Sequence, residues 1–93
     1  MAGVVVYMST VSSNQAIKKQ QQRIKMILDG KKIEYEDVDI SQKEEDKVKM
    51  REIVGDPKAL PPQICNGETY CGDYAAFEIA VEEEDIEGFL KLK

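Results

Sequence analysis

The stretch Leu60-Pro61-Pro62-Gln63-Ile64-Cys65-Asn66-Gly67 decides how the rest of the chain is arranged. A pair of prolines leads into a short apolar run, and the run ends in an Asn-Gly dipeptide. Proline cannot donate to a strand ladder, so Pro62 belongs at the first residue or the edge of a strand. Asn66-Gly67 favours a two-residue hairpin turn, because such a turn needs positive φ at its central residues. We therefore expect a hairpin that begins at a proline pair of unusual backbone geometry, since X-Pro bonds adopt cis at low cost.

The chain before this stretch predicts a strand, a helix and a second strand. Residues 4–8 are β-branched and apolar without alternation, which is typical of a central strand buried on both faces. Residues 14–29 carry apolar side chains at helical spacing, and Gly30 is the expected C-terminal stop. Residues 33–40 begin with the alternation of a half-buried strand. These three segments predict a parallel, right-handed βαβ unit.

Capping patterns mark the remaining helices. Ser41 and Glu44 have the spacing of a capping box that opens a second helix, which ends near Gly55. After the hairpin, Asp73 and Asp85 are expected to cap two more helices. The element order β-α-β-α-β-β-α-α predicts a single α/β domain over residues 1–93. Its sheet is mixed and four-stranded, with helices on both faces.

Composition excludes several classes of function. The net charge of −5 argues against nucleic acid and anionic membranes as partners. No apolar run approaches the ~20 residues of a membrane span, so we expect no membrane insertion. Histidine is absent, which removes the most usual general base and metal ligand. The acidic segments lack the start of a calcium-binding EF-hand loop, so neither a metal nor a cofactor is expected.

The two cysteines do not form a redox pair. Cys65 and Cys71 lack the C-x-x-C spacing, and a hairpin turn at Asn66-Gly67 would pair Cys65 with Glu68 and place Cys71 opposite Pro62. The two thiols would then be offset by roughly 10 Å, which is too far for an unstrained disulfide. A strand cysteine is more often a small buried hydrophobe than a reactive group. Cys71 lies next to a glycine and nearer the expected groove, so it is the better candidate for a redox-sensitive thiol.

With this element order, the chain resembles the glutaredoxins, members of the thioredoxin-like fold. Residues 4–7 match the buried strand that precedes the family's C-x-x-C, Pro62 matches its cis-proline, and Gly72-Asp73 matches a later turn. The resemblance implies a cis Pro61–Pro62 bond. The redox motif itself falls on Ser12-Ser13-Asn14-Gln15, which contains no thiol. A serine hydroxyl is not ionised at neutral pH and forms no mixed disulfide.

A narrower resemblance covers the whole chain. The pieces that carry it are Ala16-Ile17-Lys18-Lys19-Gln20-Gln21, Leu60-Pro61-Pro62-Gln63-Ile64, Tyr70-Cys71-Gly72-Asp73-Tyr74 and Phe89-Leu90-Lys91-Leu92. They are similar to the SH3-domain-binding glutamic-acid-rich protein-like family, in its short type without a glutamate-rich tail. The resemblance implies a cytoplasmic protein, with the nucleus as a second location, that modulates glutaredoxin activity and binds SH3 domains. It also implies weak or absent glutathione binding, because Pro61 lacks the N–H that would hold the peptide.

We therefore expect a non-enzymatic binding or modulator protein with an unidentified protein partner. A groove at a helix N-terminus is the expected site, where backbone N–H groups favour an anion or a peptide carboxylate. Its candidate residues are Ser12, Ser13, Asn14, Gln15, Pro61, Pro62, Gly72, Asp73 and Tyr74. One alternative is a one-cysteine thiol oxidoreductase that uses Cys71. Another is an SH3-domain ligand through Leu60-Pro61-Pro62, although the chain contains no P-x-x-P spacing.

Overall fold

The computed structural model describes residues 3–11 and 14–92 of the chain. Its strands form one mixed four-stranded sheet in the order β2-β1-β3-β4. The pairing of β1 with β2 is parallel, whereas β1 with β3 and β3 with β4 are antiparallel. The elements are β1 (Val4–Met8), α1 (Gln15–Gly30), β2 (Glu36–Asp39), α2 (Glu44–Val54), β3 (Gln63–Asn66), β4 (Thr69–Asp73), α3 (Tyr74–Glu82) and α4 (Ile86–Phe89).

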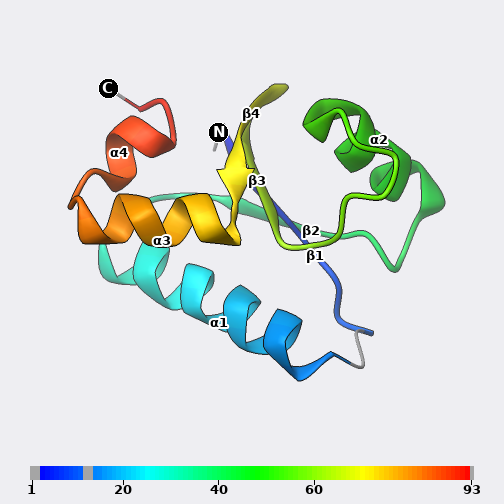
Figure 1. Ribbon diagram of the computed structural model, residues 1–93, viewed down its shortest axis with the longest axis horizontal. Helices are drawn as coiled ribbons and strands as arrows, with labels where there is room; N and C mark the ends of the chain where they lie inside the picture. Colours follow the sequence, from blue (N-terminus) through cyan, green and yellow to red (C-terminus); the bar gives the residue numbers. More distant parts are fainter. Residues whose placement is uncertain (1–2, 12–13, 93) are drawn as a thin grey trace.

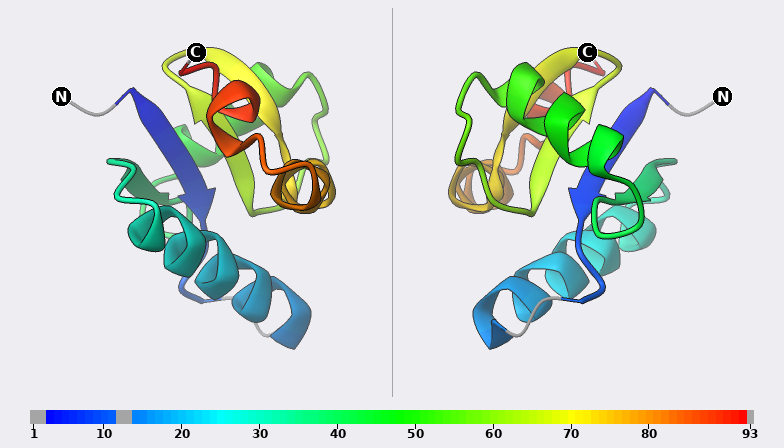
Figure 2. Two further views of the ribbon diagram at one scale, coloured as in Figure 1. Left: turned by 90° about the vertical axis from the view of Figure 1, so that its left-hand side faces the viewer. Right: turned by 90° about the vertical axis from the view of Figure 1, so that its right-hand side faces the viewer.

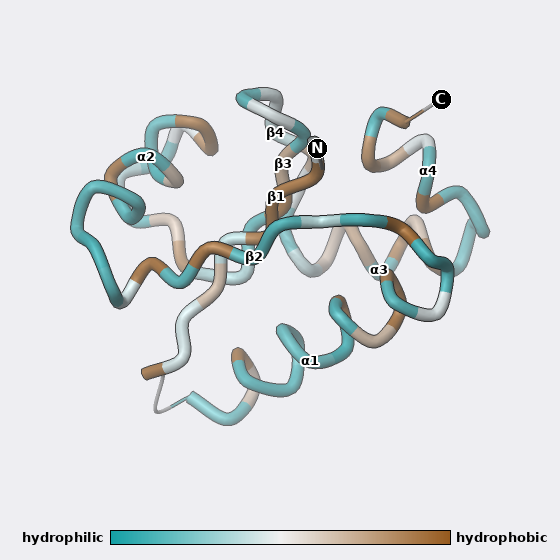
Figure 3. Tube along the Cα trace, turned by 180° about the vertical axis from the view of Figure 1, so that it is seen from behind, coloured by the Kyte–Doolittle hydropathy of each residue, from teal (hydrophilic) through white to brown (hydrophobic). Residues whose placement is uncertain are grey.

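Each face of the sheet packs against its own set of helices. On one face α1, α3 and α4 cover a cluster built around Val6, Ile64 and Phe77. On the other face α2 inserts Met50 between Tyr7 and side chains of the following loop. Figure 1 shows this layering, and the two opposite views of Figure 2 bring first α3 and α4, then α2, to the front. The continuous apolar run of β1 is explained by this two-sided burial, and Figure 3 shows its brown colour at the centre of the molecule.

The predicted fold class and element order are confirmed, but several boundaries differ from the sequence expectation. The second strand covers only Glu36–Asp39 rather than residues 33–40. Gly30 is the last helical residue of α1, and the left-handed residue that follows is Lys32, with φ of 57°. By contrast, Gly55 is left-handed, with φ of 83°, and ends α2 as expected.

The capping box expected at Ser41 and Glu44 is not formed. The N-cap of α2 is Lys43, and its side chain makes no capping hydrogen bond. The Ser41 hydroxyl and N–H donate instead to the Asp39 carboxylate. An ionised acceptor makes stronger hydrogen bonds than a neutral one, so the Ser41 hydroxyl bonds to the Asp39 carboxylate rather than capping α2.

The hairpin turn lies one residue later than expected. Asn66 pairs with Thr69, so the central turn residues are Gly67 and Glu68. Only Gly67 has positive φ, at 62°, as a turn with glycine in the first central position requires. Asn66 stays in β3, where its side-chain amide donates to the Leu90 carbonyl oxygen at 2.8 Å. This contact ties the hairpin to the C-terminal segment.

The hairpin also contains an irregularity that changes the positions of the cysteines. Cys65 pairs with Tyr70 and Ile64 pairs with Gly72, so Cys71 is the extra residue of a β-bulge. The expected pairing of Cys65 with Glu68, and of Cys71 with Pro62, is therefore wrong. Both cysteines are free thiols. They lie on opposite faces of the sheet, because Cys65 belongs to the cluster under α2 and Cys71 packs against the cluster under α1 and α3.

Candidate binding groove

A groove of about 560 Å³ lies where the start of α1, the loop before β3 and the start of α3 meet. Five residues expected from the sequence line it: Asn14, Pro61, Pro62, Asp73 and Tyr74. Gln15 and Gly72 are not among its lining residues. Ser12 and Ser13 lie outside the described residues. The sequence did not identify the rest of the lining, which comprises Ala16, Ile17, Gln20, Val54, Asp56, Lys58, Ala59, Leu60, Gln63, Tyr70 and Ala75.

The proline pair forms one wall of the groove, and the Pro61–Pro62 peptide bond is cis. Pro62 is buried and Pro61 half-buried, whereas the Leu60 side chain is 63% exposed. The Gln63 amide donates to the Leu60 carbonyl oxygen at 2.8 Å and accepts from the Tyr70 hydroxyl at 2.8 Å. Gln63 is itself buried, so this pair of bonds satisfies a polar group inside the fold and fixes the turn that presents Leu60.

Two helices begin at the groove, and both are capped by side chains. The Asn14 carbonyl oxygen Oδ1 accepts from the N–H groups of Ala16 and Ile17, at 2.8 and 3.3 Å. The Asp73 carboxylate accepts from the Ala76 N–H at 3.0 Å. These caps satisfy helix donors that would otherwise be free to bind an anion. The expected binding of an anion or a peptide carboxylate at the N-terminus of α1 stays a prediction, and it would use donors that these caps leave open.

The Tyr74 side chain is held in the groove wall by an ion pair between two helices. The Arg23 guanidinium of α1 pairs with the Glu78 carboxylate of α3. The hydrogen bond from Arg23 lowers the pKa of Glu78. Burial, followed by a hydrogen bond to Glu78, raises the pKa of the Tyr74 hydroxyl. Tyr74 therefore contributes to the groove as a neutral aromatic side chain next to this ion pair.

The loop between β1 and α1 is anchored at two points. Gln21 of α1 is only 5% exposed, and its amide makes reciprocal hydrogen bonds with the backbone of Ser9. On the other side, the Thr10 N–H and hydroxyl donate to the Asp39 carboxylate. Partial burial acts to raise the pKa of Asp39, but the hydrogen bonds from Ser41 and Thr10 outweigh it and hold this pKa well below its usual range. Ser9, which these bonds hold, lies beside Leu60 and Pro61 of the groove wall.

Neither thiol of the chain lines the groove. Cys65 is fully buried, and burial raises its pKa to about 11. Cys71 is half-buried, and burial raises its pKa as well. A raised pKa keeps a thiol protonated at neutral pH, and the protonated form is a poor nucleophile. Cys71 therefore lacks both the position and the ionisation that the redox alternative requires.

Gly72 has a packing role beside the groove. A β-carbon at this position would lie 2.8 Å from side-chain atoms of Ala76 and Phe89, closer than real contacts allow. The Phe89 ring also packs edge-on against Phe77, with centroids 6.0 Å apart. The glycine thus lets α3 and α4 approach the sheet, which fixes the position of the helix that carries Tyr74.

Comparison with known proteins extends this description. A sequence profile of the family "SH3-binding, glutamic acid-rich protein" matches residues 2–93. The Drosophila melanogaster "SH3 domain-binding glutamic acid-rich protein homolog" is 46% identical over 99 residues, covering 94% of this chain. The chain spans 63% of the length of that curated relative.

Solved structures agree on the fold. Candida albicans actin interacting protein Aip5 superposes with a TM-score of 0.78 at 22% identity, covering 97% of this chain and 89% of the other. A buckwheat glutaredoxin–glutathione complex superposes with a TM-score of 0.70 at 15% identity, covering 96% and 76%. At these identities the likeness establishes a shared thioredoxin-like fold. Among the described residues, no helix is long and apolar enough to cross a membrane.

Proposed function

Because the chain belongs to the SH3-binding, glutamic acid-rich protein family, we propose that it is a non-enzymatic binding protein whose groove holds an extended segment of a partner protein. The observation that carries this proposal is the lack of a thiol in a groove that the glutaredoxin-like fold retains. Disulfide exchange needs a thiolate that attacks a disulfide sulfur. The two cysteines lie elsewhere, one buried and one in a bulge on the opposite face of the sheet.

The groove wall has features that suit a peptide. Leu60 presents an exposed apolar side chain beside Pro61, whose carbonyl group remains able to accept a hydrogen bond although its nitrogen cannot donate. Tyr70 and Tyr74 add aromatic surface, and such residues often serve as anchors in protein interfaces. A tripeptide thiol such as glutathione would find neither a thiol partner nor a donor at Pro61. We therefore propose that glutathione binds weakly or not at all.

The shared fold suggests how such a protein would modulate a glutaredoxin. A groove of similar position without a nucleophile would compete for the protein segments that a glutaredoxin reduces. The expected effect is slower reduction of a disulfide-bonded protein substrate when this protein is in excess. A small disulfide that makes few contacts with the groove should be reduced at an unchanged rate.

The test begins with a glutathione-dependent disulfide reductase assay on the wild type and on a Ser12→Cys, Gln15→Cys variant. We expect an inactive wild type and a double variant with measurable but weak activity, because the thiols are restored while Pro61 still lacks a donor for glutathione. Wild-type activity that disappears in Cys71→Ser would instead show an enzyme with a displaced nucleophile.

A second experiment tests the groove directly. Excess wild type is added to an active glutaredoxin acting on a protein disulfide, beside a Leu60→Glu variant. The matched control is Val48→Glu, which changes a 47% exposed apolar residue of α2 outside the groove. Inhibition by wild type and Val48→Glu, but not by Leu60→Glu, supports the proposal. Equal inhibition by all three proteins would exclude the groove as the binding site.

The curated relative is named as binding SH3 domains. In this chain the alternative expected from the sequence is an SH3 ligand through Leu60-Pro61-Pro62. Its geometry argues against display as a polyproline ligand. Pro62 is buried, and the Leu60 carbonyl oxygen accepts a hydrogen bond from the Gln63 amide. An SH3 domain would require this segment to detach from the base of the β3–β4 hairpin. The groove is therefore the function that the structure favours.

A further inference from the structure

Strand β2 forms an edge of the sheet on the side away from the groove. The Ile40 N–H donates to the Met8 carbonyl oxygen of β1 at 2.8 Å. Because backbone groups alternate along a strand, Glu36 and Val38 also face β1, and the N–H and C=O groups of Tyr35 and Asp37 face outward. Within residues 3–11 and 14–92, no other strand covers this edge. It is therefore a template for pairing with another chain.

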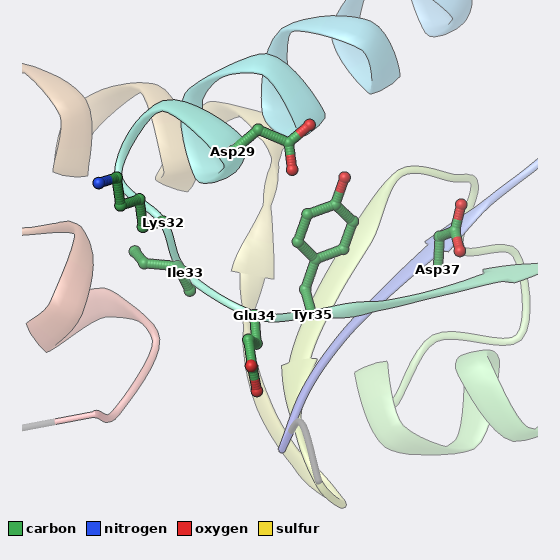
Figure 4. A pocket seen from close by; sticks show the side chains of 6 residues that line it. All are labelled: Asp29, Lys32, Ile33, Glu34, Tyr35 and Asp37. Carbon is green, nitrogen blue, oxygen red and sulfur yellow. The ribbon is translucent and has the colours of Figure 1, made fainter.

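A hollow of about 590 Å³ follows this edge. Figure 4 shows the Tyr35 ring standing between the carboxylates of Asp29 and Asp37. Burial raises the pKa of the Tyr35 hydroxyl, and the charges of these two carboxylates raise it further. The other lining residues are Lys32, Ile33 and Glu34. The hollow thus combines an aromatic ring and a partly buried apolar side chain with an excess of negative charge.

The acidic groups lie on both faces of the edge. Tyr35 packs against the cluster under α1, whereas Val38, which shares a face with Glu36, packs against the cluster under α2. Asp37 lies on the α1 side, where Lys25 pairs with it at 3.0 Å. An added strand would alternate its own side chains between these two faces. Positive side chains would therefore meet a carboxylate on either face.

We propose that the β2 edge binds an extended, basic segment of a partner protein by adding it to the sheet as a fifth strand. Main-chain hydrogen bonds to Tyr35 and Asp37 would supply attraction, and the acidic side chains would select lysine and arginine. A cationic side chain over the Tyr35 ring adds a favourable contact between charge and aromatic face. This site is separate from the groove and does not depend on the function proposed for it.

The charges select a partner and exclude a second copy of the chain. Two β2 edges brought together would oppose Glu34 and Glu36 to the same residues of the neighbour, and like charges opposite each other destabilise a strand pair. Charged edges of this kind are a known way to prevent self-association. The net charge of −5 adds long-range attraction for a basic segment and repulsion for an identical chain.

The experiment uses the full chain labelled with ¹⁵N and three capped nine-residue peptides. The first alternates valine and lysine, the second replaces lysine with glutamate, and the third keeps every lysine but replaces valine with proline. Proline removes the N–H groups needed for strand pairing without changing the charge. We expect saturable shifts of the Tyr35 and Asp37 amide signals with the first peptide only. Equal shifts with the third peptide would show charge attraction without strand addition and would overturn the proposal.

Matched variants test the charges and the backbone separately. Glu34→Lys with Glu36→Lys should weaken binding of the valine-lysine peptide about tenfold or more. Each exposed charge pair contributes a modest energy, but the double variant turns two attractive contacts into repulsive ones. The control, Glu52→Lys with Glu87→Lys, changes the net charge equally at exposed positions outside the hollow and should change affinity less than twofold. Equal weakening by both double variants would overturn the proposal.

The backbone test replaces one outward N–H. Asp37→Pro removes a donor on the exposed edge, where proline is tolerated, and Asp37→Asn removes the same charge while keeping the donor. Binding should be lost in the proline variant and retained in the asparagine variant. Retained binding in a folded Asp37→Pro protein would contradict strand addition. Sedimentation equilibrium completes the test, because wild-type self-association that disappears on Asp37→Pro would assign the edge to a second copy instead.

Discussion

Replacing Gln21 by leucine should loosen the loop that leads to the groove. The Gln21 amide makes two reciprocal hydrogen bonds to the Ser9 backbone, at 2.9 and 3.0 Å, and the residue is only 5% exposed. Leucine has a similar volume but leaves the Ser9 N–H and C=O without these partners. A buried polar group that loses its partner costs about 1–3 kcal/mol. Ser9 is half-buried, so the lower end applies to each group, and the variant should lose about 2 kcal/mol of stability.

The measurement is thermal unfolding followed by circular dichroism, with Gln22→Leu as the control. Gln22 is the next residue of α1 and is exposed, so the same substitution there removes no buried hydrogen bond. For a domain of this size, 2 kcal/mol corresponds to a decrease in Tm of about 8–16 °C. The Gln22→Leu protein should unfold within about 3 °C of the wild type. If the two variants have the same Tm, Gln21 does not anchor the loop and the reasoning is refuted.

Three further predictions concern single residues. Hydrogen bonds lower the pKa of Asp39 in the folded protein, so they stabilise the fold above pH about 4 and this stabilisation is lost as the pH falls further. In Asp39→Asn the free energy of unfolding should therefore depend less on pH below about 4, as measured by tyrosine fluorescence. Gly72→Ala should lower the free energy of unfolding in urea by about 1–3 kcal/mol, because its β-carbon would lie 2.8 Å from side chains of α3 and α4. The control is Gly30→Ala, whose β-carbon meets no atom within 4 Å and which should leave stability unchanged or increased. Burial raises the pKa of both thiols, to about 11 for Cys65. A disulfide-exchange reagent at pH 7 should therefore modify Cys71 slowly and Cys65 only after unfolding. Rapid modification of both thiols in the folded protein would contradict their placement.

Local signals in the sequence were sufficient for most of the fold. The apolar run at residues 4–8 predicted the central strand because burial on both faces leaves no room for polar side chains. Asp73 and Asp85 predicted the caps of α3 and α4 because a capping bond joins residues only three apart. Gly55 predicted the end of α2 for the same reason, since its left-handed conformation needs no distant partner.

The errors occur where a distant residue competes with a local pattern. Ser41 has the spacing of a capping residue, but the Asp39 carboxylate takes its hydroxyl. Asn66 was predicted as a turn residue, but its side-chain amide donates a hydrogen bond to the carbonyl oxygen of Leu90, twenty-four positions later. Gln21 reads as part of a polar helix face, and nothing in its neighbours along the chain reveals that it meets Ser9. Such pairings depend on the packed structure, so periodicity and capping rules do not contain them.

The residues of the candidate groove also fall into those that the sequence predicted and those that depend on distant contacts. Resemblance to the glutaredoxin fold predicted that Pro61, Pro62 and Tyr74 share one site, and all three line the groove. The network of Gln63 with Leu60 and Tyr70 was missed, since it joins a loop carbonyl to a neighbouring strand through a buried amide. The polar edge of β2 was also missed as a site. The sequence of an acidic strand indicates only a solvent-exposed surface, and its place at the edge of the sheet is known only from the structure.

The anchoring of the loop before α1 bears on whether the groove is used. Holding Ser9 and Thr10 requires a buried amide from α1 and a carboxylate from β2, and both polar groups must be fully satisfied to avoid a desolvation cost. An apolar residue at the position of Gln21 would fill the same space but would leave the Ser9 N–H and C=O without these partners. The Gln21 amide and the Asp39 carboxylate thus hold Ser9 and Thr10 in a defined conformation. Ser9 lies beside Leu60 and Pro61, so a fixed Ser9 next to the proline wall would lower the cost of ordering a bound partner segment, as the proposed binding function requires.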